Sequence, residues 1–201
     1  MIRLGVLISG GGSNLQAIID AIEAGKLDAE IVLVVSSKAD AYGLTRAEQA
    51  GIPTLALTKA DYEDPLAADE RITSALQDAQ ANYVVMAGYM RMVREPLLKA
   101  FPDRIINLHP ALLPSFPGAH GIADAFDYGV KLTGVTVHFA NEEYDKGAII
   151  AQRPVLIAED DTLESLEEKI HAVEHELYPQ VLQMIAQGRV IIGEDGKVRI
   201  L

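Results

Sequence analysis

Three residues of this chain have the chemistry to act on a carbonyl group: an amide, an imidazole and a carboxylate. Asn107 and His109 stand two apart at the end of an apolar run, and Asp145 follows further along the chain. Side chains two apart on a strand share a face, so the amide and the imidazole can point at one bound atom. An amide N–H can stabilise an oxyanion, an imidazole can move protons near neutral pH, and a carboxylate can orient the ring. A histidine before Pro110 is also compatible with a structural hydrogen bond alone, and Asp145 with an ordinary turn.

The elements that must position these residues follow an alternating pattern. Between the apolar runs lie segments with helical periodicity, beginning with a helix for which Ser13 is the predicted N-cap. The alternation predicts an α/β fold: a doubly wound, mostly parallel sheet with helices on both faces and a Rossmann-like N-terminal half. In such sheets ligands bind at the carboxyl ends of the strands, where His109 stands. The predicted strands of this half are residues 4–8, 31–35, 54–57, 83–87 and 104–108.

After His109 the pattern changes. Residues 110–121 carry three prolines and two glycines, which predicts a long rigid loop of the kind on which sites are built. Strands are predicted again at residues 133–140 and 148–157, then a long helix over residues 163–186, and last a hairpin that turns at residues 193–196. The length of 201 residues and the lack of a linker indicate one domain, 1–201.

A glycine-rich turn follows the first strand. Gly12, Ser13 and Asn14 stand where a helix begins, so backbone N–H groups there can bind an anion. The dinucleotide fingerprint is absent because Leu15 replaces its third glycine and the second strand ends in serines and a lysine, which disfavours NAD. A single phosphate monoester is the predicted ligand, and a purely structural turn is the alternative.

Two other sets of residues admit both a structural and a functional reading. Residues 171–175 spell His-x-x-Glu-His, a metallopeptidase pattern, but their context lacks the further ligand and the surrounding scaffold of such enzymes, and we expect no metal. A packing role is the main alternative there, and a role for Glu174 as an acceptor for a ligand hydroxyl is the other. Met90 and Met92 are either core residues or the lining of a flat apolar pocket.

Composition excludes several classes of function. A net charge of −12 argues against contact with a phosphate backbone, and no apolar run reaches the length of a membrane span. The absence of cysteine excludes disulfides and thiol nucleophiles, and the amino terminus shows no secretory signal, so we expect a cytoplasmic protein. We expect small-molecule substrates, with no nucleic-acid or membrane partner, and a homodimer as the assembly to test.

Taken together, six segments resemble the phosphoribosylglycinamide formyltransferases, a branch of the folate-dependent formyltransferase family. The resemblance covers almost the whole chain, and the order and spacing of the segments are specific to this branch. The segments are Ile8-Ser9-Gly10-Gly11-Gly12-Ser13-Asn14-Leu15, Gly88-Tyr89-Met90-Arg91, Asn107-Leu108-His109-Pro110-Ala111-Leu112-Leu113-Pro114, Pro117-Gly118-Ala119-His120, Thr136-Val137-His138-Phe139 and Glu174-His175-Glu176-Leu177-Tyr178-Pro179.

The resemblance implies formyl transfer from 10-formyltetrahydrofolate to the amine of glycinamide ribonucleotide, without a metal. It implies a phosphate- and nucleotide-binding half, 1–108, and a folate-binding half with the catalytic loop, 109–201. Asn107, His109 and Asp145 would be catalytic, and Gly12, Ser13, Asn14 and Glu174 would hold the ribonucleotide. The residues implied to hold the folate are Met90, Arg91, Met92, Val93, Asn107, Asn141, Glu142, Glu143, Tyr144 and Asp145.

Other members of the wider family fit less well. The enzyme that formylates initiator tRNA is longer and has Arg-Gly where this chain has Pro117-Gly118, and formyltetrahydrofolate hydrolases have His-His in place of His109-Pro110. Residues 62–66 lack an arginine that some members use to contact the folate. The alternatives carried forward are a formyltetrahydrofolate hydrolase, a non-catalytic nucleotide-binding module and a nicotinamide-linked reductase.

Overall fold

The first part of the chain folds around parallel strands. In the computed structural model, which describes residues 1–201, Met1–Asn107 and Leu108–Leu201 are two compact units. Strands β1 to β4 belong to the first unit, and β5 crosses the boundary. They are parallel in the order β3-β2-β1-β4-β5, which confirms the predicted strands. Their bounds are β1 Ile2–Ile8, β2 Ala29–Ser36, β3 Thr54–Ala56, β4 Tyr83–Met86 and β5 Ile105–His109.

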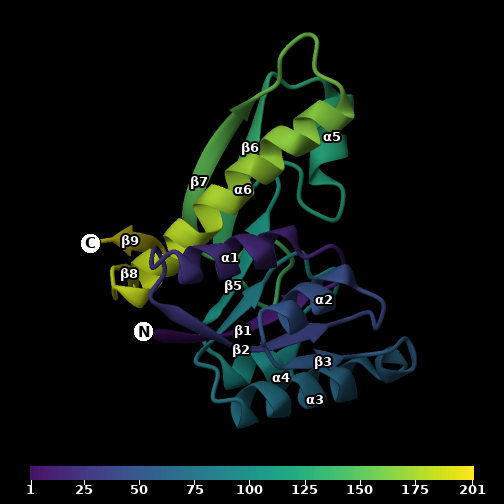
Figure 1. Ribbon diagram of the computed structural model, residues 1–201. Helices are drawn as coiled ribbons and strands as arrows, with labels where there is room; N and C mark the ends of the chain where they lie inside the picture. The colour runs from purple at the N-terminus through teal and green to yellow at the C-terminus, as the bar shows by residue number, and fades with distance from the viewer. The chain divides into compact units, whose positions relative to one another are not determined.

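Helices cover both faces of this sheet. Figure 1 shows α1 and α2 on one face of the first unit's sheet and α3 and α4 on the other. Apolar side chains on each helix face the strands because they recur at helical spacing; in α1 these are Leu15, Ile18 and Ile19. The bounds are α1 Ser13–Glu23, α2 Tyr42–Gln49, α3 Pro65–Asp78 and α4 Glu95–Ala100, with the 3-10 turn η1 Ala60–Tyr62.

The second unit combines an antiparallel strand pair with a long helix. The pair continues the strand order to β5-β6-β7, and the C-terminal hairpin pairs β8 with β9. Helix α6 begins at a capping box in which Thr162 and Ser165 bond each other's backbone N–H groups. The bounds are α5 Gly121–Tyr128, β6 Leu132–Phe139, β7 Ile149–Leu156, α6 Leu163–Ala186, β8 Val190–Ile192 and β9 Val198–Ile200.

The doubly wound, mostly parallel α/β fold is thus confirmed, and so is the extent of the long helix. One local prediction is wrong: the N-cap of α1 is Gly12, not Ser13, and no side chain caps the helix. Gly12 has φ +71°, a left-handed conformation that is unfavourable for residues with a side chain. The chain turns at Gly12, so Ser13 is already the first residue of the helix. No helix is both long and apolar enough to cross a membrane.

Candidate active site

Strand β5 presents the predicted amide and imidazole. Asn107 is half-buried and His109 is 3% exposed, and the alternation of the strand places both on one side of it. Asn107 lies in register with Met86 of β4. The strand ends at His109, so the imidazole stands at the carboxyl end as expected.

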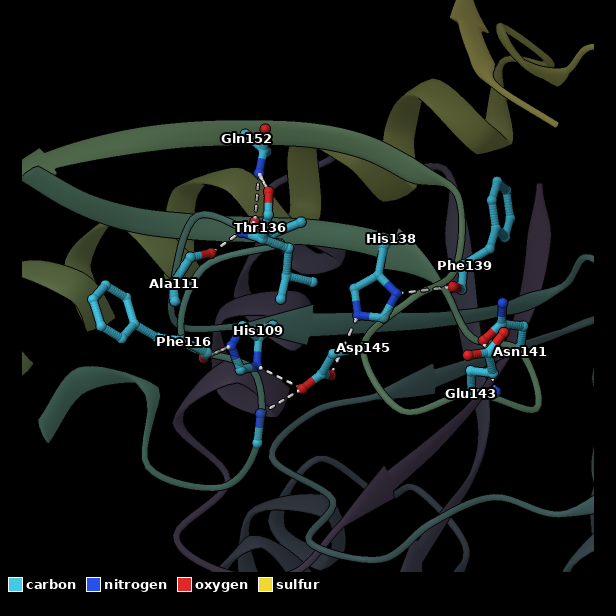
Figure 2. Close-up of polar contacts among 12 residues, drawn as sticks. His109, Ala111, Phe116, Thr136, His138, Phe139, Asn141, Glu143, Asp145 and Gln152 are labelled. Carbon is cyan, nitrogen blue, oxygen red and sulfur yellow. Dashed lines mark hydrogen bonds and ion pairs between the residues drawn. The ribbon is translucent and has the colours of Figure 1, made fainter. Parts of the chain in front are cut away.

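The imidazole of His109 faces an acceptor on each side. Nδ1 lies 3.5 Å from Oδ2 of Asp145, and Nε2 lies 2.8 Å from the carbonyl oxygen of Phe116 (Figure 2). A carbonyl oxygen can only accept, so Nε2 donates to it. Nδ1 is thereby left facing the carboxylate of Asp145. The arrangement therefore holds an N–H of His109 in place at Nε2, with the carboxylate on the opposite side of the ring.

Asp145 is a buried carboxylate and no ordinary turn residue. Its side chain is 2% exposed, its φ is +55°, and its Oδ2 accepts a hydrogen bond of 2.9 Å from the backbone N–H of Gly118. The loop that carries it closes the β6–β7 hairpin, where Gly147 allows close contact: a Cβ there would lie 1.6 Å from the carbonyl oxygen of Phe139. The hairpin thus brings Asp145 against a histidine from a different strand.

A second imidazole joins this group. Nε2 of His138 lies 3.8 Å from Oδ1 of Asp145, and Nδ1 donates to the carbonyl oxygen of Phe139 at 2.8 Å (Figure 2). Burial lowers the pKa of His138, although its bond to Phe139 and the charge of Asp145 act in the opposite direction. A neutral His138 leaves the negative charge of Asp145 to His109.

His138 is a buried residue, 2% exposed, and the sequence does not by itself predict its contact with Asp145. The local signal was the spacing of Thr136 and His138, two apart on β6 and therefore on one face. Thr136 Oγ1 donates to the carbonyl oxygen of Ala111 at 2.7 Å and accepts from the N–H of Leu113 at 3.1 Å. One face of β6 thus holds both the proline-rich loop and the carboxylate.

The glycine turn in the first unit is held by α2. The N–H of Gly43 donates to the carbonyl oxygen of Gly10 at 3.0 Å, and Nε of Arg46 donates to that of Gly11 at 2.8 Å. The carbonyl groups of Gly10 and Gly11 thus already accept hydrogen bonds from α2. A Cβ on Gly12 would lie 2.7 Å from the Cα of Gly43, so the close approach requires glycine.

The segment of residues 90–93 follows β4 in the same unit. The side chains of Met90 and Met92 are 60% and 40% exposed, while Val93 is buried, so the methionines are not core residues. The guanidinium of Arg91 lies 4.0 Å from the centre of the Tyr62 ring, at cation–π distance. The exposed methionines give this segment an apolar surface.

The remaining predicted residues belong to the second unit. Asn141, Glu142, Glu143 and Tyr144 are exposed on the loop before Asp145. Glu174 on α6 is 3% exposed, and its Oε2 bonds Nδ1 of His171 at 2.9 Å. That bond raises the pKa of His171.

The fold and the site define the chain as an α/β protein with a buried imidazole and carboxylate in contact at the end of a parallel strand. Comparison with known proteins then places it: the Formyl transferase family matches residues 2–182. The chain belongs to the formyl transferase family.

Relatives and solved structures agree. The phosphoribosylglycinamide formyltransferase of Haemophilus influenzae is 40% identical over 97% of this chain and 92% of its own length. The trifunctional purine biosynthetic protein adenosine-3 of Bos taurus is 42% identical, but the chain spans only about a fifth of it, 19%. The glycinamide ribonucleotide transformylase 1 of Symbiobacterium toebii has a TM-score of 0.96 at 47% identity, with 100% of this chain and 94% of that one covered.

Proposed function

We propose that the protein transfers the formyl group of 10-formyltetrahydrofolate to the amine of N1-(5-phospho-D-ribosyl)glycinamide, a step of purine biosynthesis. The products are the N-formylated ribonucleotide and tetrahydrofolate. The observation that carries the proposal is the His109 imidazole between two acceptors, one of them the buried carboxylate of Asp145, 3.5 Å away. Single-function relatives of nearly the same length bear the name of this activity.

The chemistry follows from the properties of the side chains. The neutral amine attacks the formyl carbon, and the carbonyl becomes a tetrahedral oxyanion. The amide of Asn107 donates to this oxyanion, and protonated His109 stabilises it and then gives its proton to the leaving nitrogen N10. The C–N10 bond breaks as that proton arrives and the carbonyl re-forms. The attacking nitrogen gives its extra proton to the now neutral imidazole of His109, which restores the imidazolium. Asp145 orients the ring and stabilises its charge.

The proton that leaves is the one on Nε2, since Nδ1 faces Asp145. Nε2 donates that proton to the carbonyl oxygen of Phe116, which lies 2.8 Å from Nε2. The reacting nitrogen must therefore take the place of the carbonyl, and the proline-rich loop must yield at Phe116 when the cofactor binds. N10 of the folate then takes over the hydrogen bond from Nε2 of His109 that the carbonyl oxygen of Phe116 accepts in the free protein.

Ligand binding is divided among the other predicted residues. Gly12, Ser13 and Asn14 are proposed to hold the phosphate, because the turn carries no side-chain cap and its carbonyls are tied back to α2. Glu174 is proposed to accept from a hydroxyl of the ribonucleotide. The folate ring is proposed to lie against Met90, Arg91, Met92 and Val93 and against the loop of Asn141, Glu142, Glu143, Tyr144 and Asp145. No metal takes part in this chemistry.

The test is a formyl-transfer assay with the purified protein. The protein is mixed with 10-formyltetrahydrofolate, with and without glycinamide ribonucleotide, and both tetrahydrofolate and formate are measured. We expect tetrahydrofolate only when the acceptor is present, and none with His109→Ala. Formate released without acceptor would identify a hydrolase instead. Binding of the ribonucleotide without any turnover would identify a non-catalytic nucleotide-binding module.

A further inference from the structure

A serine hydroxyl joins the glycine turn to the 90–93 segment. Ser9 directly follows β1 and precedes the glycines, and its side chain is buried. Its Oγ accepts a hydrogen bond of 2.8 Å from the backbone N–H of Met90. We propose that Ser9 is a positioning residue that couples binding of the phosphorylated substrate at the glycine turn to binding of the folate at the 90–93 segment. This inference rests on the proposed function.

The topology explains why one hydroxyl can reach both segments. Strands β1 and β4 are parallel neighbours, with Leu7 in register with Met86. The chain that leaves β1 and the chain that leaves β4 therefore emerge at the same edge of the sheet. Ser9 and Met90 lie on these two connections, and the hydrogen bond of 2.8 Å joins them there.

A second serine completes the network on the other side. Oγ of Ser37, which follows β2, lies 2.6 Å from Oγ of Ser9, and its backbone N–H donates to the carbonyl oxygen of Ile8 at 3.0 Å. Either hydroxyl can be the donor in the contact between the two serines, so the bond from Met90 to Ser9 does not depend on Ser37. Ser37 itself makes no bond to the 90–93 segment among those described, which makes it a matched control.

The glycine turn that follows Ser9 is held to α2 by two hydrogen bonds. The carbonyls of Gly10 and Gly11 are bound by the N–H of Gly43 and by Arg46 at 3.0 and 2.8 Å. An anion that binds the N–H groups at the start of α1 would act on a backbone whose carbonyl groups are already hydrogen-bonded to α2. The backbone between Gly12 and Ser9 is short, so the position of Ser9 is fixed when the anion fixes the turn.

The far end of the 90–93 segment has a different anchor. The backbone N–H of Arg94 donates to Oδ2 of Asp69, a buried carboxylate on α3, at 2.6 Å. Loss of this bond should loosen the segment and weaken folate binding. It should not change the coupling between the two ligands, because Asp69 lies on α3 and not on the glycine turn.

The experiment measures the dissociation constant of tetrahydrofolate with and without saturating glycinamide ribonucleotide, a pair that cannot react. In the wild type we expect the ribonucleotide to tighten folate binding. In Ser9→Ala we expect this ratio to fall by about three- to tenfold, toward one, as for the loss of one hydrogen bond. Ser37→Ala should keep the wild-type ratio, and Asp69→Ala should weaken folate binding in both conditions equally.

Kinetics separate positioning from damage to the fold. Ser9→Ala should raise KM for the folate while kcat stays within about twofold, because Ser9 touches no reacting atom, and Ser9→Thr, which keeps the hydroxyl, should restore the ratio. A wild type whose two ligands bind independently, or an unchanged ratio in Ser9→Ala, would overturn the coupling. A wild type that transfers no formyl group would overturn the proposed function instead, so the two failures are distinguishable.

Discussion

Removing the charge of Asp145 is the sharpest test of the proton donor. In Asp145→Asn the side chain keeps its size and keeps an oxygen that can accept a hydrogen bond. In the wild type Oδ2 of Asp145 accepts this bond from the N–H of Gly118 at 2.9 Å. What it loses is the negative charge 3.5 Å from Nδ1 of His109. We expect kcat to fall by about 10²–10³-fold, while the variant stays folded.

The magnitude follows from the distance and the burial. At an effective dielectric constant of about 20, unit charges 3.5 Å apart attract by about 5 kcal/mol. The side chains of His109 and Asp145 are 4% and 2% exposed, so solvent screens little of this. A loss of about 10²–10³ in rate corresponds to about 3–4 kcal/mol, somewhat less than the gross attraction because the asparagine still offers a dipole.

The assay is single-turnover formyl transfer with saturating cofactor, so that binding and product release do not mask the chemical step. Glu159→Gln is the matched control, because it removes the same charge from an exposed ion pair with Lys131 in the same unit and should change kcat by less than about twofold. A folded Asp145→Asn enzyme with a single-turnover rate near that of the wild type would refute the assigned role of the carboxylate.

The other predictions concern the remaining parts of the site. Asn107→Ala should lower single-turnover transfer by about 10²–10³-fold with little change in ligand affinity, and a normal rate would remove Asn107 from the oxyanion site. Gly12→Ala should lower Tm by about 4 °C or more and raise KM for the ribonucleotide, because φ is +71° and the added Cβ would meet the backbone of α2. Gly10→Ala is the control: a Cβ at Gly10 would meet nothing within 4 Å, so this variant should keep a Tm close to that of the wild type. Because its bond to Glu174 raises the pKa of His171, the stability it contributes is present below about pH 6.5 and is lost as the pH rises through the raised value. His171→Ala should therefore lower Tm by about 1–2 °C near pH 6 and by less near pH 9, a small effect because the ring is half exposed; calorimetry at both values is the check.

Much of the fold was predictable because its signals are local. Apolar runs marked the strands of the parallel sheet, and helical periodicity marked α6 at the bounds that the structure has. The cap of α1 was not predictable in the same way. Ser13 has the right residue type, but Gly12 adopts φ +71° because the turn packs against Gly43 of α2, which is a tertiary contact.

The candidate site likewise has one part that the sequence determines locally and one part that depends on tertiary contacts. The sequence by itself determined that Asn107 and His109 share a face, because the two-residue period of a strand is a property of the backbone. Only the tertiary structure decided which groups contact the two ring nitrogens of His109. The β6–β7 hairpin brings Asp145 to one nitrogen and the loop brings the Phe116 carbonyl to the other. These contacts depend on strand pairing and loop closure between residues far apart along the chain, which residue types and spacing do not encode locally.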